Sequence, residues 1–340
     1  MNNKLSVSVI LPAYNVEKTI KDCLNRIIEE TNELESEIIV VDDNSEDRTA
    51  EIVKTFKGVN LIKLDNNQGA GNARNIGVNE AIYENLCFID SDLIISHNSI
   101  INLVKRLKKD EEVGTVSACQ DSFNLNKNSW SSYFVCLKSS YGVEEIEKEK
   151  EFSTCCSEFF VISKKLFFEA GKFKTFNNAG GEEFHLGYKI TQLNKKNIKT
   201  KGATYSAHYC DLYTRFKNIV QRTSKYIPLF IQKKKFDSKG TFATLDQFFS
   251  SLLTLIIILY ILFCLFSNNA VLTFELLAII IFQLVIELKF LIFSQKKYGL
   301  KMVLFSLFGI QVINFGILYG VVIFFYKTTM GKILKQHLSY

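Results

Sequence analysis

The chain has 340 residues and a formal net charge of +6, with 47% hydrophobic and 22% charged residues. Its 2 prolines and 17 glycines exclude collagen-like and Pro/Gly-rich disordered proteins. The mean hydropathy is slightly positive, at +0.09, so apolar residues must be concentrated in one part of the chain.

The N-terminus does not resemble a secretory signal peptide. Its apolar run alternates with polar residues and ends at Pro12 without a small-residue cleavage site. The 8 cysteines show no C-x-x-C spacing. We therefore expect reduced thiols in a cytoplasmic domain.

Strand and helix signals alternate over the first 92 residues. In chain order, the sequence predicts strand 7–14, helix 17–31, strand 36–43, helix 47–56, strand 60–65, helix 70–84 and strand 85–92. This rhythm predicts an α/β fold with a doubly wound, mainly parallel sheet and helices on both faces.

Three of these strands end in polar residues, namely Tyr14, Asp42–Asp43 and Asp90-Ser91-Asp92. Ligands of such sheets bind beyond the carboxyl ends of the strands. Two carboxylates two residues apart suit a hard divalent cation such as Mg²⁺ or Mn²⁺. A pair of acids in a solvated loop is the alternative.

A Gly-rich turn at 66–77 invites comparison with dinucleotide-binding folds. Gly69 and Gly71 fit that pattern, but its third glycine is missing and the turn follows the third strand rather than the first. The turn therefore disfavours a hydride-transferring enzyme.

Residues 212–236 carry apolar side chains on one helical face and basic side chains on the other. This pattern is typical of a helix in a membrane interface. The positive charge then fits anionic lipid, and since no nucleic-acid motif is present we expect no nucleic-acid partner.

Three apolar segments follow, at 248–266, 270–293 and 302–326, each long enough to cross a bilayer. The predicted domains are a catalytic domain at 1–211, an amphipathic linker helix at 212–240 and a transmembrane region at 241–340.

Basic residues predict the orientation of these segments. Lysines 233–235 precede the first span and lysines 296, 297 and 301 follow the second, whereas the loop 267–269 is uncharged. The positive-inside rule then predicts a multi-pass plasma-membrane protein with a cytoplasmic catalytic domain. Lysines in the tail conflict with three spans, and a re-entrant hairpin at Gly309 or Gly316 is the alternative.

Five segments together resemble the family 2 inverting glycosyltransferases of the GT-A fold. They occur in the family's order over most of residues 5–210. The segments are SVILPAYNVEKTI (8–20), IIVVDDNSEDRTAEIV (38–53), NNQGAGNARNIGVNEA (66–81), FIDSDLI (88–94) and FVISKKLFFEAGKFKTFNNAGGEEFHLGYKI (160–190). The resemblance implies a nucleotide-sugar donor, with UDP favoured as the commonest nucleotide in the family, and a divalent cation.

The resemblance also implies a donor site. Its residues would be Pro12, Ala13, Tyr14, Glu17, Asp43, Gly69, Gly71, Arg74, Asp90 and Ser91. Tyr14 offers a ring for base stacking, Asp43 would accept a hydrogen bond from the base, and Arg74 would contact the diphosphate.

The metal and catalytic residues are implied in the same way. Asp92 and Asp90 would hold the cation, with His208 either a third ligand or a structural residue. Both would be catalytic residues, with Glu183 as the base and Glu182 holding the loop or the acceptor, although Asp is more usual than Glu at the position of the base. An acid pair at a helix N-terminus is the alternative.

The predicted function is therefore transfer of a sugar to a hydroxyl of a lipid-linked or growing surface glycan, with membrane lipids and other envelope-glycan assembly proteins as partners. Three alternatives stay open: a polyprenyl-phosphate glycosyltransferase, a processive polymer synthase and a non-catalytic nucleotide-sugar-binding scaffold.

Overall fold

The computed structural model describes residues 4–126, 129–144, 146–175, 181–233, 244–266 and 274–337. The chain forms two compact units. The first comprises the residues up to Leu125 together with Gly142–His208. The second comprises Asn126–Tyr141 and the residues from Tyr209 onward.

A nine-stranded sheet forms the centre of the first unit, in the order β3-β2-β1-β4-β8-β6-β9-β5, with β7 pairing with β9. The strands are β1 (Ser6–Ala13), β2 (Glu35–Asp42), β3 (Val59–Lys63), β4 (Asn85–Ile89), β5 (Leu93–Ile95), β6 (Val113–Asn124), β7 (Glu149–Phe152), β8 (Phe159–Ser163) and β9 (Lys196–Ala207).

The predicted parallel strands form one half of this sheet. β1 pairs in parallel with β2 and β4, and β2 pairs in parallel with β3. The other half is mixed, because β8 runs antiparallel to both β4 and β6. This antiparallel pairing brings the chain before β8 next to the end of β4, where the Asp90 N–H donates to the Glu158 carbonyl at 2.8 Å.

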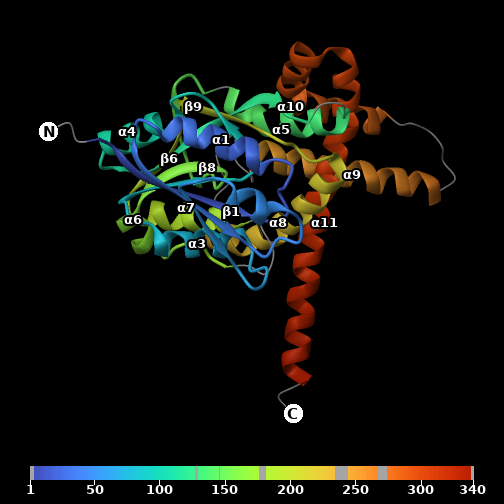
Figure 1. The fold of residues 1–340 in the computed structure, drawn as a ribbon. Helices are drawn as coiled ribbons and strands as arrows, with labels where there is room; N and C mark the ends of the chain where they lie inside the picture. The colour runs from blue at the N-terminus through green and yellow to red at the C-terminus, as the bar shows by residue number, and fades with distance from the viewer. Residues whose placement is uncertain are drawn as a thin grey trace. The chain divides into compact units, whose positions relative to one another are not determined.

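Helices cover both faces of the sheet, with α1 and α4 on one side and α3, α6 and α7 on the other (Figure 1). They are α1 (Ile20–Thr31), α2 (Thr49–Lys54), α3 (Ala70–Glu80), α4 (Ser99–Lys109), α6 (Lys164–Glu169) and α7 (Glu182–Gln192). The helices predicted at 17–31, 47–56 and 70–84 are confirmed with shorter ends. Between α3, α6, α7 and the sheet lies an aromatic core in which Phe88 stacks on Phe160 at 4.9 Å between ring centroids.

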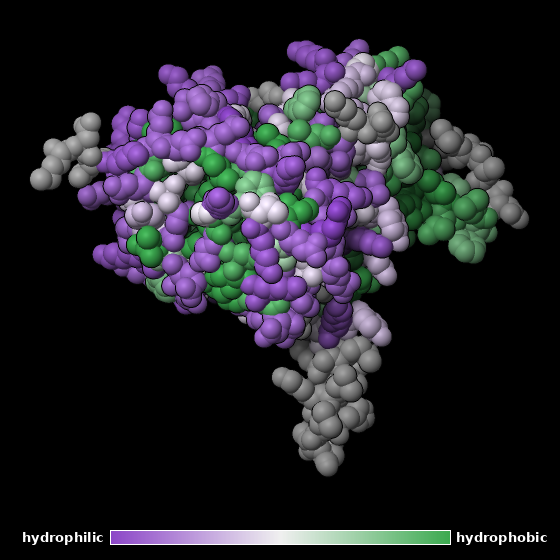
Figure 2. Space-filling view, in the orientation of Figure 1, coloured by the Kyte–Doolittle hydropathy of each residue, from purple (hydrophilic) through white to green (hydrophobic). Residues whose placement is uncertain are grey.

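The second unit is helical. Its helices are α5 (Trp130–Glu144), α8 (Leu212–Lys233), α9 (Leu245–Phe266), α10 (Phe274–Tyr298) and α11 (Leu300–His337). α9, α10 and the Leu300–Thr329 part of α11 are long and apolar enough to cross a membrane. Their large apolar side chains are exposed, and Figure 2 shows apolar residues gathered on this part of the chain.

α11 continues without a break through Gly309 and Gly316, so the re-entrant hairpin considered from the sequence is wrong. Other predictions cannot be compared: the loop 267–269, the first residues of the span predicted at 270–293, and Lys234 and Lys235 lie outside the described residues.

The amphipathic pattern of α8 is confirmed, and its apolar face packs against α11. The Phe216 and Phe315 rings stack with centroids 6.1 Å apart. Gly316 and Gly320, one turn apart on α11, allow this approach. A Cβ at Gly320 would lie only 2.8 Å from the Val220 carbonyl oxygen. Small residues at this spacing are typical of close helix packing in membranes.

Candidate active site

A cavity of about 380 Å³ lies beyond the carboxyl ends of β1, β2 and β4, at the edge where the sequence predicts a ligand. It is lined by Pro12, Ala13, Tyr14, Val16, Asp43, Asn67, Gly69, Ala70, Arg74, Asp90, Ser91 and Asp92. Most of the predicted donor and metal residues are therefore gathered in one pocket. Val16, Asn67 and Ala70 were not predicted from the sequence.

Asp43 shapes the pocket from the end of β2. Its two carboxylate oxygens accept hydrogen bonds from the backbone N–H groups of Gln68 and Gly69, at 2.7 and 2.8 Å. Gly69 itself has a φ of 86°, which favours glycine. Asp43 thus holds the Gly-rich turn against the pocket in addition to any contact with a ligand.

Tyr14 follows β1, lines the pocket and is 45% exposed, which leaves it accessible to a stacking partner. Glu17 lies outside the pocket lining. Its carboxylate accepts from the Arg48 side chain at 3.3 Å, and its N–H donates to Asp47 at 3.0 Å. Glu17 therefore joins the loops after β1 and β2.

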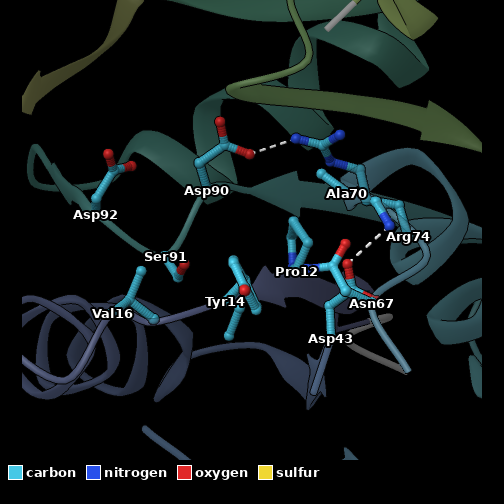
Figure 3. A pocket seen from close by; sticks show the side chains of 12 residues that line it. Pro12, Tyr14, Val16, Asp43, Asn67, Ala70, Arg74, Asp90, Ser91 and Asp92 are labelled. Carbon is cyan, nitrogen blue, oxygen red and sulfur yellow. Dashed lines mark hydrogen bonds and ion pairs between the residues drawn. The ribbon is translucent and has the colours of Figure 1, made fainter. Parts of the chain in front are cut away.

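Arg74, on α3, is 2% exposed and lies between two acidic groups. Its guanidinium donates to the Asp90 carboxylate at 2.5 Å and to the Glu182 carboxylate at 3.2 Å. Figure 3 shows this contact with Asp90, with Pro12 and Tyr14 across the pocket. Arg74 thus connects the Asp90-Ser91-Asp92 segment to the start of α7.

Burial raises the pKa of both pocket aspartates, Asp90 and Asp92. It raises the pKa of Asp90 to about 7, although the neighbouring Arg74 guanidinium acts in the opposite direction. Burial likewise raises the pKa of Asp92 to about 6, and the negative charge of Glu158 adds to this effect. A bound cation would reverse these shifts, because it stabilises the ionised carboxylates.

The donor set fits a divalent cation with incomplete protein ligation. Arg74 already pairs with one oxygen of Asp90, which leaves Asp92 and the other Asp90 oxygen for a cation. In the described part of the chain, no cluster of three or more His, Cys, Asp or Glu side chains is arranged to hold a metal. Mg²⁺ and Mn²⁺ sites of this kind take their other ligands from water and substrate phosphates.

His208 follows β9 and does not line the pocket. Partial burial lowers the pKa of its imidazole, and the charge of Asp22 opposes that change. His208 and the two aspartates do not form a three-ligand cluster among the described residues. The structure thus gives no geometric support to His208 as the third metal ligand.

Glu182 and Glu183 occupy the first turn of α7, and both are buried. The Glu183 carboxylate accepts from the Gly181 N–H at 2.9 Å, next to the N-terminus of its own helix. Gly180 lies outside the described residues. Gly71 packs against this turn, because a Cβ there would lie 3.4 Å from Glu182. Gly71 itself does not line the pocket.

Glu158 is a further acidic residue beside the site that sequence reasoning missed. It precedes β8, and its carboxylate accepts a short hydrogen bond from the buried Tyr205 hydroxyl. Its charge raises the pKa of both Asp90 and Asp92. Only the antiparallel pairing of β4 with β8 brings it there, so no local pattern could have indicated it.

Residues 8–171, just under half of the chain, match the family model described as Glycosyl transferase family 2. This segment includes every residue of the pocket and ends before Glu182. Residues 8–171 thus match a family 2 glycosyltransferase domain.

Curated relatives agree with this assignment. Glycosyltransferase GlyG of Streptococcus pneumoniae serotype 4 is 31% identical over 41% of this chain and 46% of its own length. Poly-beta-1,6-N-acetyl-D-glucosamine synthase of Staphylococcus epidermidis is 32% identical over 33% of this chain and 27% of its own. The chain therefore spans less than half the length of either relative.

The fold also has solved counterparts. Mannosyltransferase PcManGT from Pyrobaculum calidifontis, solved in complex with GDP-Man and Mn²⁺, has a TM-score of 0.55 and 16% identity. The similarity covers 94% of this chain and 87% of that one. The sheet and its helices thus resemble the GT-A glycosyltransferases, as predicted.

Proposed function

We propose that the protein is a membrane-bound, metal-dependent, inverting glycosyltransferase. It transfers a sugar from a nucleotide-diphosphate donor to a hydroxyl of a lipid-linked or growing surface glycan at the cytoplasmic face. The observation that carries this proposal is that Tyr14, Arg74, Asp90 and Asp92 line the same pocket at the carboxyl ends of parallel strands.

The donor lies in this pocket with its base against Tyr14 and its diphosphate towards Asp90 and Asp92. A divalent cation held by these two carboxylates would neutralise the charge that develops on the departing nucleoside diphosphate. Arg74 keeps Asp90 in place through its 2.5 Å contact. We assign Arg74 a positioning role, because its guanidinium is already engaged by two carboxylates.

The acceptor reaction needs a base on the side opposite the leaving group. The acceptor oxygen forms a bond to the anomeric carbon while the bond from that carbon to the diphosphate oxygen breaks with its electron pair. Glu183 takes the acceptor proton, and the configuration inverts. The Gly181 N–H, which donates to Glu183, orients the carboxylate for this step.

The membrane helices favour an acceptor that is held at the bilayer. Confining enzyme and acceptor to one surface raises their effective concentration. Positive charge before α9 and in the last turn of α10 supports a cytoplasmic position for the pocket.

A donor panel tests this proposal. Purified full-length protein, with membranes that contain lipid-linked glycans, is scored for Mn²⁺-dependent nucleotide release from UDP-, GDP- and dTDP-sugars. We expect one donor class to be used, and Asp92→Ala to abolish release. The exposed Glu51→Ala on α2 is the matched control and should keep full release.

The role of Glu183 separates this function from its main alternative. A polyprenyl-phosphate acceptor is already an anion and needs no base, so full transfer by Glu183→Ala would favour that enzyme. Metal-dependent nucleotide binding without release from any donor would favour a non-catalytic protein, and long polymeric products a processive synthase.

A further inference from the structure

The apolar helices of the second unit enclose polar side chains. On α9 the buried residues are Ser250, Ser251 and Thr254, whereas its large apolar side chains face outward. α10 and α11 contribute further polar residues to the same interior. We call this set the bundle polar cluster, and it comprises Ser250, Ser251, Thr254, Gln283, Glu287, Gln311 and Asn314.

Hydrogen bonds join all three helices through this cluster. The Gln283 amide on α10 donates to Thr254 on α9 at 2.8 Å. The Asn314 amide on α11 donates to Ser250 on α9 at 2.9 Å. The Gln311 amide donates to Gln283 at 3.0 Å, which joins α11 to α10. Few water molecules compete for these groups in a bilayer, so the cluster fixes one arrangement of the helices.

One ionised group of the cluster has its partner outside the three helices. Glu287 lies near the middle of α10, and it accepts from Ser250 at 2.9 Å through one oxygen. Its other oxygen lies 2.7 Å from the Lys138 ammonium, which comes from α5. The same ammonium lies 4.4 Å from the centre of the Phe290 ring. A buried carboxylate within an apolar helix thus has a dedicated cation.

Next to the ion pair, a side chain of α5 fits closely against α10 and α11. Phe134 lies one turn before Lys138 on α5, on the same face of that helix. Its ring meets Phe290 of α10 and Phe305 of α11, with centroids about 6 Å away. It also fills the space at Gly309, where a Cβ would lie only 2.6 Å from the ring. Charge and shape therefore specify the same position of α5.

The position of α5 in the sequence makes this docking informative. The chain leaves the first unit after Leu125, and it returns there at Gly142. α5 therefore stands between β6 and β7, within the sequence of the sheet-forming unit, but packs with helices that follow residue 244.

We propose that α5 is a fourth helix of the membrane bundle, and that the Lys138–Glu287 pair is the contact that holds it there. The partner of the α5 face made by Phe134 and Lys138 is the α10–α11 surface of this same chain. Since Glu287 neutralises Lys138, the pair offers no spare charge to a lipid phosphate. This proposal does not depend on which sugar, if any, the protein transfers.

Charge reversal and exchange test the pair in the full-length protein in detergent micelles. The variants are Lys138→Glu, Glu287→Lys and the double exchange, with Lys289→Glu as the matched control on an exposed position of α10. The measurements are the apparent melting temperature and the rate of tryptic cleavage after Lys148 and Lys150, beside the end of α5.

Each single reversal should lower the melting temperature, because it places two like charges side by side inside the bundle. It should also increase the rate of cleavage by about a hundredfold. The double exchange should restore most of both values, and Lys289→Glu should leave them unchanged. Single variants that match the control in both measurements, or an exchange no better than the singles, would overturn the proposal.

Variants with uncharged side chains test the pair if the charge-reversal variants are not produced in folded form. Lys138→Met and Glu287→Gln should each destabilise more than the combined double variant, since each single change leaves one uncompensated charge. Strictly additive effects would contradict a direct pair. Gly309→Leu tests the shape of the contact, because its side chain would clash with the Phe134 ring and lower the melting temperature. Adding Phe134→Ala to the same protein should remove the clash and restore part of the loss.

Discussion

At the scale of single residues, Arg74 organises the charges of the site. It is buried with Asp90 on one side and Glu182 on the other, 16 and 108 residues away in the sequence. Removing it would leave the buried Glu182 and the partly buried Asp90 without their cation, a loss of about 3 kcal/mol at the lower end of the range for buried pairs. The residue that joins the metal side of the pocket to the start of α7 is therefore as much structural as functional.

The raised pKa values of Asp90, to about 7, and Asp92, to about 6, predict how pH affects the site. Both lie above the ordinary value of 3.8. Protein without a cation therefore loses stability as the pH rises from 3.8 to about 7. Cation affinity changes in the opposite sense, because binding needs ionised carboxylates. We expect Mn²⁺ affinity, measured from free Mn²⁺ by electron paramagnetic resonance, to rise by about three orders of magnitude between pH 5 and pH 8.

Glu158→Gln sharpens this prediction. The charge of Glu158 raises the pKa of both aspartates, so its removal should move the midpoint of the pH profile to lower pH. The exposed Glu51→Gln serves as the control and should leave the midpoint in place. An unchanged midpoint in Glu158→Gln would show that this carboxylate does not act on the pocket.

At the scale of elements, the placement of α7 depends on a glycine that looks unfavourable in sequence. A Cβ at Gly187 would lie 2.3 Å from the Cys155 backbone nitrogen and 2.6 Å from the Thr154 Cα. Backbone atoms cannot move aside cheaply, so this glycine lets α7 approach the segment before β8. The first turn of α7, with Glu182 and Glu183, is positioned by that approach.

Gly187→Ala should therefore destabilise the protein by about 1–3 kcal/mol, although helix propensity alone would favour Ala by about 1 kcal/mol. The measurement is the melting temperature, followed by sugar transfer and Mn²⁺ binding. Transfer should fall further than Mn²⁺ binding, because α7 carries Glu183 and the aspartates lie elsewhere. Lys189→Ala, at an exposed position of α7, is the control; equal stability of the two variants would contradict the close contact.

The elements that could be predicted are those with local signals. Parallel strands β1, β2, β3 and β4 follow from apolar runs between amphipathic helices, and their ends predicted the pocket. The second half of the sheet could not be predicted, since β6, β8 and β9 are paired by residues 43 to 85 positions apart. Glu158 and the Arg74–Glu182 contact depend on that pairing and were missed for the same reason.

At the scale of the whole molecule, three helices long and apolar enough to cross a membrane follow the sheet-forming unit. The sequence located all three because charge-free stretches of this length are a strong local signal. It did not indicate that α5 packs with them, because Lys138 and Phe134 form no pattern of their own. Their role depends on contacts with Glu287 and Gly309, which lie far along the chain.

The continuous α11 predicts where the C-terminus lies. Three crossings place the two ends of the chain on opposite sides of the membrane, although Lys327 favours the cytoplasmic side. We expect alkaline phosphatase fused after Tyr340 to be active and green fluorescent protein at the same position to be dark. Fusions after Lys233 should give the reverse pattern, and fluorescence at Tyr340 would mean that α11 does not cross.

The Lys138–Glu287 contact also bears on how the protein is made. The two residues are 149 positions apart, so at about 5–20 residues per second Lys138 leaves the ribosome roughly 7–30 seconds before Glu287. During that interval α5 has neither its charge partner nor the space at Gly309 that Phe134 fills. The nascent chain therefore carries α5 without its bundle partners until the last spans enter the bilayer, so we expect the bundle to be completed only after they insert.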